Sequence, residues 1–408
     1  MTSATEPKAL PIQQPAPGVK LVVVLSALMA LGSVATDMYL PAMPALATIF
    51  GVPAARVQLT LSSFLVGFST GQLAWGPLGD RYGRKSMVAV GILFYLAGSA
   101  GCALSDTAAE MMVWRFVQAV GACAGPVLAR AMVRDLYGRD RAASMLSVLL
   151  LVMGIAPLVA PLLGGQVLVS WSWRGIFWIQ ALFGVLALGG VATLRETLLP
   201  EYRISLRLGG MLFSYLQLVL DRRFLGYGLS GGFFYAGVLA YVAGTPFAYI
   251  DYYGVPAQLY GLLFGMNIAG MMTANMVNSR LVLRLGTDRL FRIGTGISAA
   301  AGVVLMIDGY TGFGGLWGLV VPIFFYVAML GLVVANSIAG ALSAFPHKAG
   351  TASALVGAVQ FALAALSSAA IGWVSDGTPW AMALIVGASG VLALLANVAL
   401  VRGTPPQA

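Results

Sequence analysis

Apolar stretches long enough to cross a bilayer as helices, about 20 residues each, recur along the whole chain and constrain its fold more than any other feature. The strands of a membrane β-barrel would instead alternate apolar and polar residues over about ten positions. Only 9% of the residues are charged and 59% are hydrophobic, whereas a soluble domain carries roughly 25% charged residues. The sequence therefore predicts an all-α integral membrane protein.

Breaks rich in charged or turn-forming residues divide the apolar stretches into twelve predicted helices. Their ranges are 20–43, 57–78, 87–105, 108–133, 143–168, 173–194, 223–250, 258–281, 290–308, 313–342, 350–374 and 379–402. Two similar halves that face a site at the midplane are a transporter architecture. We expect one six-helix bundle at 20–194, a linker at 195–222 and a second bundle at 223–402, with tails at 1–19 and 403–408. The polar, proline-rich first tail is typical of disordered segments, and no signal peptide is expected.

Basic residues gather in the loops on one side of the predicted membrane, which accounts for the net charge of +9 without a nucleic-acid partner. The opposite loops carry acids and two basic exceptions, namely Asp106, Glu110, Asp251, Asp308 and Asp376 against Arg56 and Arg174. Because cytoplasmic loops are the basic ones, we expect a multi-pass protein with both termini in the cytoplasm.

The turn after the second predicted helix reads GPLGDRYGRK, residues 76–85. Gly76 and Gly79 permit close helix approach, and Gly83 permits a backbone conformation that other residues resist. Asp80 can accept hydrogen bonds from a helix N-terminus or an arginine, with Arg81 and Arg84 at hand. The turn is predicted to latch two helices together and to open when the halves rock apart; the alternative is an ordinary basic loop.

The fourth predicted helix contains RFVQAVGACAGP, in which Arg115 and Gln118 share one helical face. An arginine inside a span costs about 3 kcal/mol or considerably more unless it faces water or a partner. Arg115 is therefore a candidate functional residue, and the alternative is a structural arginine paired with a carbonyl.

The fifth predicted helix contains GIAPLVAPLLGG, residues 154–165. Its small and kinkable residues recur near a spacing of three to four and make one smooth face. They are Gly154, Pro157, Pro161, Gly164 and Gly165. We expect this face to take part in conformational gating.

The first predicted helix ends in ATDMYLPAMP, which places Asp37 where a spanning helix should still be running. A carboxylate at this depth is a functional candidate because hydrocarbon disfavours its charge. The alternative is a carboxylate at the interface that caps a helix end.

These motifs resemble one family. The turn at 76–85 is similar to the signature loop of the Major Facilitator Superfamily, and Arg-x-x-Gln-Ala-x-Gly resembles the fourth-helix motif of its proton-coupled exporters. Residues 154–165 resemble the fifth-helix motif of its antiporters, with Ala160 where many members have glycine. DMYLP and SWSWRGIFWI resemble the bicyclomycin-resistance and chloramphenicol/florfenicol exporters. The resemblance implies the superfamily fold, two pseudo-symmetric bundles whose first and fourth helices line one cavity, so that Asp37 would lie near Arg115.

The implied activity is proton-coupled multidrug efflux by alternating access. Burial disfavours the charged form of Asp37 and a guanidinium favours it, so the carboxylate can gain and lose a proton beside the fixed charge of Arg115. One strong intramembrane acid fits exchange of one proton for small neutral or amphipathic antibiotics, such as phenicols or bicyclomycin. Export or uptake of an endogenous metabolite is the alternative, and a membrane enzyme or non-transporting receptor is a third class.

Aromatic and amide side chains on several predicted helices suit an amphipathic drug, although each could equally serve helix packing. The candidates for substrate binding are Tyr39, Gln118, Tyr235, Tyr241, Asn267, Tyr326, Asn336 and Gln360. We expect no cofactor, metal site or enzymatic activity, because Lys85 follows Arg84 rather than the glycine of a P-loop and no ligand or nucleophile cluster is recognisable. The expected partners are the substrate, protons and lipid, around a monomer.

Overall fold

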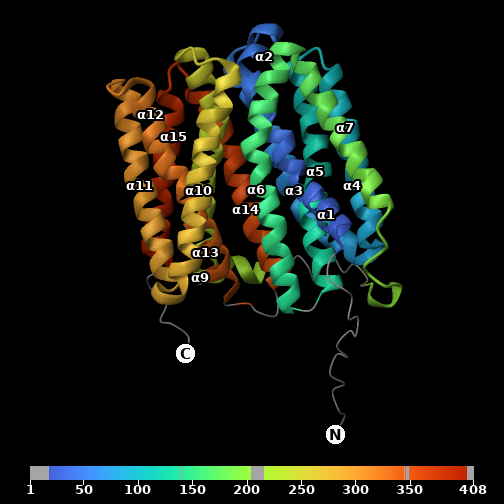
Figure 1. Ribbon diagram of the computed structural model, residues 1–408. Coiled ribbons are helices and arrows are strands. Elements are labelled where there is room, and N and C mark those ends of the chain that lie inside the picture. Colours follow the sequence, from blue (N-terminus) through green and yellow to red (C-terminus); the bar gives the residue numbers. More distant parts are fainter. Residues whose placement is uncertain (1–17, 138, 204–215, 344, 346–348, 402–408) are drawn as a thin grey trace.

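The computed structural model describes residues 18–137, 139–203, 216–343, 345 and 349–401, and in these residues all regular secondary structure is helical. Long helices run up and down side by side (Figure 1). Nearly all of the expected tails, 1–19 and 403–408, lies outside the described residues.

The first half of the chain contains six membrane-length rods. The first rod combines α1 (Val19–Asp37), the 3₁₀ turn η1 (Leu40–Ala42) and α2 (Met43–Phe50). The others are α3 (Ala54–Tyr82), α4 (Arg84–Leu104), α5 (Ala108–Leu136), α6 (Arg139–Ser170) and α7 (Trp173–Ala192). The segment expected as a linker contains a 3₁₀ turn, η2 (Pro200–Tyr202).

The second half repeats this arrangement. Its rods are α9 (Arg222–Thr245) with η3 (Pro246–Tyr252), α10 (Ala257–Leu285), α11 (Thr287–Thr311), α12 (Gly315–Ala328) with α13 (Leu330–Ser343), α14 (Ala349–Val374) and α15 (Trp380–Ala396) with η5 (Asn397–Val401). In the described residues, nine rods are apolar and long enough to cross a membrane. With α3, α6 and α10 they make up the twelve predicted spans.

The helix boundaries follow local chemistry. Thr107, Ser172 and Asp221 are N-cap residues whose side chains accept hydrogen bonds from backbone N–H groups in the first turns of α5, α7 and α9. Two sharp turns instead use glycine, since Gly83 (φ 98°) joins α3 to α4 and Gly286 (φ 76°) joins α10 to α11. Each half therefore links its second and third rods through one left-handed glycine.

The first rod is longer than the predicted 20–43 and breaks near its middle. The α-helix ends at Asp37, and its last i→i−4 hydrogen bond runs from the N–H of Met38 to the carbonyl of Val34. Pro41, which has no N–H, cannot continue this pattern. The N–H of Tyr39 donates to the carbonyl of Thr36, 3.2 Å away, rather than to that of Ala35. The break therefore releases the Ala35 carbonyl inside the membrane-spanning part of the chain.

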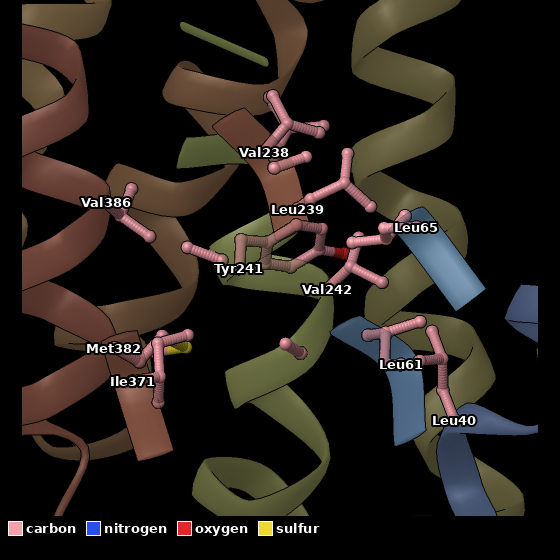
Figure 2. Packing of buried hydrophobic residues seen from close by; sticks show 14 of the residues in the cluster. Leu40, Leu61, Leu65, Val238, Leu239, Tyr241, Val242, Ile371, Met382 and Val386 are labelled. Atoms are coloured by element: carbon pink, nitrogen blue, oxygen red, sulfur yellow. The ribbon is translucent and has the colours of Figure 1, made fainter. Parts of the chain in front are cut away.

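The molecule has two ends (Figure 1). We call the end with η1, α2 and η3 the α2 end, and we call the end where α1 starts and α15 finishes the terminal end. The two halves share a hydrophobic core at the α2 end. Leu61 and Leu65 of α3 lie beside Val238 and Val242 of α9 (Figure 2), within one buried cluster that draws on both halves. A second cluster belongs almost entirely to the first half.

The outer surface is apolar. Leu186, Leu283 and Trp373 are among many large hydrophobic side chains that lie exposed on the outside of the helices. Such a surface is stable only against lipid, which agrees with the membrane assignment made from the composition.

Candidate functional site

The side chain of Arg115 lies fully buried in the first half. Its Nη1 donates to the carbonyl of Ala35 at 2.9 Å and to Oε1 of Gln118 at 2.7 Å. The rings of Tyr39 and Phe64 flank the guanidinium, with their centres 4.6 and 4.3 Å from its central carbon. Two aromatic faces stabilise a desolvated cation, so the guanidinium is fixed in place by α1, α3 and its own helix, α5.

Two of the guanidinium nitrogens have no partner. Nε and Nη2 of Arg115 are buried and make no hydrogen bond within the described residues. A buried donor without an acceptor costs about 1–3 kcal/mol, and more for a charged group. Arg115 therefore retains capacity for a further acceptor.

Gln118 extends this contact into a buried polar network. Its Nε2 donates to Oγ of Ser99 and to Oε1 of Gln180, each at 2.8 Å. Gln180 in turn reaches the Ala35 carbonyl at 3.4 Å. Sequence reasoning missed Ser99 and Gln180, although Gln180 stands out as an amide inside the apolar run of α7.

Asp37 is buried, with 8% of its surface exposed. Among the described residues, no ion pair or hydrogen bond joins its carboxylate to another side chain, so the expected contact with Arg115 is absent here. The physical reason is the break in the first rod, since Arg115 satisfies the released carbonyl of Ala35, two residues before Asp37. The geometry matches the alternative of an arginine paired with a carbonyl.

Asp37 lies within electrostatic range of three tyrosine hydroxyl groups of the second half, those of Tyr235 and Tyr241 in α9 and of Tyr260 in α10. The hydroxyl of Tyr241 accepts a hydrogen bond from Nδ2 of Asn267 at 2.8 Å. The structure thus brings three of the candidate substrate residues, Tyr235, Tyr241 and Asn267, into the electrostatic surroundings of the acid.

Three of the other candidates, Tyr39, Tyr326 and Asn336, have partners of their own. Tyr39 makes a hydrogen bond of 2.7 Å with Thr60, and Tyr326 donates to the carbonyl of Phe234 at 3.2 Å. Asn336 donates to Asn278 at 2.7 Å, away from Asp37. Gln360 is buried, and its Nε2 has no partner in the described residues.

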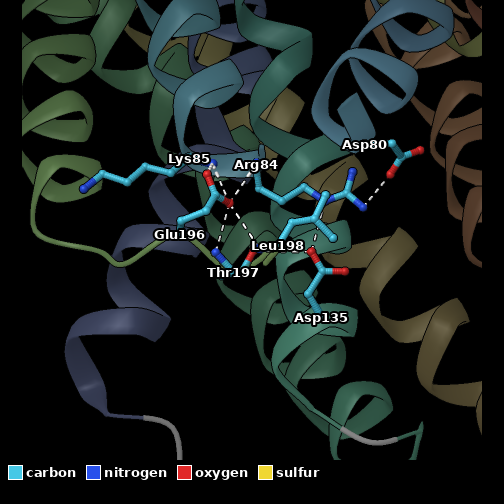
Figure 3. A network of polar contacts seen from close by, with 7 residues as sticks. All are labelled: Asp80, Arg84, Lys85, Asp135, Glu196, Thr197 and Leu198. Atoms are coloured by element: carbon cyan, nitrogen blue, oxygen red, sulfur yellow. Dashed lines mark hydrogen bonds and ion pairs between the residues drawn. The ribbon is translucent and has the colours of Figure 1, made fainter. Parts of the chain in front are cut away.

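The turn at 76–85 forms an ion-pair cluster (Figure 3). Arg84 contacts Asp80 at 2.6 Å and Asp135 of α5 at 3.0 Å. Gly79 is packed as expected, because a Cβ there would lie 2.5 Å from Leu128. The expectation for Gly76 is wrong, since a Cβ there would meet no atom within 4 Å. Arg81 is exposed and lies over the ring of Tyr82, 5.0 Å from its centre.

Glu196, which sequence reasoning missed, closes this cluster from the segment after α7 (Figure 3). Its carboxylate accepts hydrogen bonds from the backbone N–H groups of Arg84 and Thr197 at 2.9 Å, and of Lys85 and Leu198 at 3.2 Å. It therefore supplies the N-terminal cap that Gly83 cannot give to α4. An acid in the otherwise basic stretch LRETLLP was the available signal.

We expect Glu196→Ala to lower the free energy of unfolding by about 1–3 kcal/mol, because a charged acceptor of four backbone N–H groups is lost. Thermal unfolding of the purified protein, followed by the reactivity of Cys102 and Cys123, measures this, since both thiols are buried in the folded state. Glu201→Ala is the matched control, as Glu201 is an exposed acid on the same segment. Equal melting of the two variants would contradict the capping role.

The small-residue face of α6 packs against both halves. A Cβ on Gly164 would lie 2.0 Å from the carbonyl oxygen of Met38, and one on Gly165 would lie 2.4 Å from that of Ala257 in α10. Pro157 and Pro161 both lie inside the helix. Gly154 departs from the expected close packing, because nothing lies within 4 Å of its added Cβ.

Gly165→Ala is expected to separate α6 from α10 and to reduce transport strongly. Overpacking against a rigid carbonyl costs about 1–3 kcal/mol. This is enough to lower the population of the conformation in which α6 and α10 are packed together by roughly tenfold. Pulsed electron resonance between spin labels on the exposed residues Ser170 and Tyr252 reports the separation. Gly154→Ala adds the same methyl to the same helix and should leave both readouts unchanged; an unchanged distance in Gly165→Ala would refute the gating role.

Comparisons with known proteins agree with this architecture. The family model of the Major Facilitator Superfamily matches residues 25–368. A bicyclomycin resistance protein homolog of Haemophilus influenzae is 34% identical over 361 residues, which are 88% of this chain and 90% of that protein. A chloramphenicol resistance protein of Pseudomonas aeruginosa is 33% identical over 86% of this chain and 82% of its own. The crystal structure of a D-xylose-proton symporter superposes with a TM-score of 0.78 at 17% identity, covering 95% of this chain and 98% of that one, which shows a shared fold alone.

Proposed function

The chain belongs to the Major Facilitator Superfamily, and on that premise we propose that it exports small neutral or amphipathic antibiotics in exchange for protons. Phenicols and bicyclomycin are the first substrates to test, because similar chains carry resistance to chloramphenicol and bicyclomycin in their names. The charge distribution of the loops supports an inner-membrane protein with both termini in the cytoplasm. The α2 end would then face outward.

The observation that carries the proposal is the position of Asp37. It is a buried acid without a fixed partner in the described residues, and it lies within electrostatic range of three tyrosines of the opposite half. A proton on Asp37 removes that charge from the boundary between the halves. Protonation can therefore bias which arrangement of the two halves is favoured, as alternating access requires.

Arg115 plays a different role from the one expected of an ion-pair partner. It anchors the carbonyl of Ala35 and thereby fixes the break that presents Asp37 to the second half. We propose that the guanidinium sets the position and the potential of the proton site through α1, without a direct contact in this conformation. A proton entering down the membrane potential contributes about 2.3 kcal/mol per 100 mV, which drives the outward step.

A susceptibility panel in a host that lacks its own efflux pumps tests the function. Expression should raise the inhibitory concentration of at least one phenicol or of bicyclomycin, and a protonophore should abolish the drug's efflux from loaded cells. An unchanged panel, together with increased cellular accumulation of a nutrient, would favour uptake of a metabolite by the same fold.

A further inference from the structure

The terminal end of the second half contains an open pocket of about 560 Å³ that none of the roles above explains. Three arginines line it, Arg223 from α9 and Arg289 and Arg292 from α11, against one acid, Asp288. The carboxylate of Asp288 accepts a hydrogen bond from the hydroxyl of Tyr227. The described lining is therefore positively charged overall, in a space large enough for a ligand of several atoms.

One guanidinium nitrogen in this lining, Nε of Arg223, is buried and lacks a hydrogen-bond partner among the described residues. The guanidinium stands 5.9 Å from the centre of the Tyr227 ring, which holds it against the pocket wall. A planar guanidinium with a free donor matches the geometry of phosphate oxygens.

The pocket lies at the start of α11, and the equivalent place in the first half is the start of α4. There, the turn at Gly83 leads into α4, and the carboxylate of Glu196 occupies the start of that helix. In the second half, the turn at Gly286 leads into α11, and among the described residues no side chain accepts a hydrogen bond from the first turn of that helix. The described residues instead leave the arginine-lined pocket at this place, and a Cβ on Gly286 would meet nothing within 4 Å.

We propose that this pocket binds a phosphate-bearing anion, which takes the place at α11 that Glu196 takes at α4. The three guanidinium groups and the first-turn N–H groups of α11 supply the donors. The headgroup of an anionic phospholipid and a free phosphate share this chemistry. A basic pocket at the membrane surface favours the lipid, since anionic headgroups are concentrated there.

Thermal unfolding of the purified full chain, stripped of lipid in detergent, tests the site with three probes. These are dioctanoyl phosphatidylglycerol, dioctanoylglycerol with the same tails and no phosphate, and inorganic phosphate. Phosphatidylglycerol is expected to raise the melting temperature and dioctanoylglycerol is not. A comparable rise with inorganic phosphate would also support the site and would identify a free anion as sufficient.

The variant Arg289→Gln/Arg292→Gln should raise the half-saturating concentration of the active probe roughly tenfold or more, as two charge-assisted contacts are lost. Arg280→Gln/Arg284→Gln is the matched control, since it removes two exposed arginines near the same end that do not line the pocket. It should stay within about twofold of the parent.

A third variant protects the test against misfolding. Ser343→Glu keeps every arginine and places a carboxylate on the pocket lining, so it should abolish the response to the probe and raise the melting temperature without it. The proposal would be overturned if Arg289→Gln/Arg292→Gln and Arg280→Gln/Arg284→Gln responded equally to the active probe. It would also be overturned if phosphatidylglycerol and dioctanoylglycerol had equal effects on the melting temperature and inorganic phosphate had none. None of these measurements depends on transport.

Discussion

Asp37→Asn is expected to abolish drug accumulation driven by a pH gradient in reconstituted vesicles. The amide has nearly the shape of the protonated acid but cannot release a proton, so residue 37 would stay uncharged throughout the transport cycle. Exchange of labelled for unlabelled drug without a gradient should persist, because it needs the rocking motion and not the proton. The measurement is therefore a pair of fluxes on the same vesicles, one with the gradient and one without.

Asp106→Asn is the matched control for this experiment. Asp106 is an exposed acid that pairs with Arg174 at 2.8 Å near the α2 end, outside the boundary between the halves. Its variant should keep both fluxes. Gradient-driven accumulation by Asp37→Asn would show that the proton is carried elsewhere, whereas loss of both fluxes would point to a structural role for the acid.

Arg115→Ala should eliminate both fluxes. It removes the shorter of the two hydrogen bonds to the Ala35 carbonyl, leaving the 3.4 Å contact from Gln180, and it takes the donor from Oε1 of Gln118. It also opens a cavity between the rings of Tyr39 and Phe64. The break in the first rod then loses its anchor, so Asp37 is no longer held toward the second half. Flux measurements as above, with monodispersity of the purified protein as the check on folding, give the result.

Arg115→Lys separates charge from geometry. A lysine keeps the positive charge but cannot lie as a flat fork between two rings, so we expect a variant that folds and exchanges drug at a reduced rate. Arg130→Ala serves as control, because Arg130 lies on the same helix and its side chain donates, among the described residues, a hydrogen bond only to the carbonyl of Pro126 one turn earlier. Full activity of Arg115→Ala would remove the arginine from the proposed mechanism.

The arrangement of the spans could be predicted from the sequence because hydropathy and loop charge act locally. The left-handed turn at Gly83 and the Asp80–Arg84 contact were also accessible, since both lie within one short motif. The crowding at Gly165 followed from the same small-residue reasoning that failed at Gly76 and Gly154. Residue spacing identifies a helix face made of small residues, but it does not tell which of those residues packs against a neighbouring helix.

The partner of Arg115 could not be predicted in the same way. The family resemblance implied a position near Asp37, but the contact depends on a carbonyl that is available only because the first rod breaks before Pro41. Glu196 was equally hidden, because its role requires the segment after α7 to fold back onto the start of α4, 112 positions earlier in the chain. Both contacts depend on which tertiary neighbour receives an unsatisfied backbone group, and no local pattern encodes that.

The Ala35 carbonyl has a consequence for how resistance can evolve. Arg115 and Gln180 both donate to it, and Gln118 and Ser99 continue the same chain of hydrogen bonds toward α4. A substitution at Ser99, which is buried in the first half, would therefore change the hydrogen bonds that hold the first rod at Ala35. Laboratory selection on new antibiotics should therefore recover changed specificity from positions that never touch a drug molecule, alongside those that do.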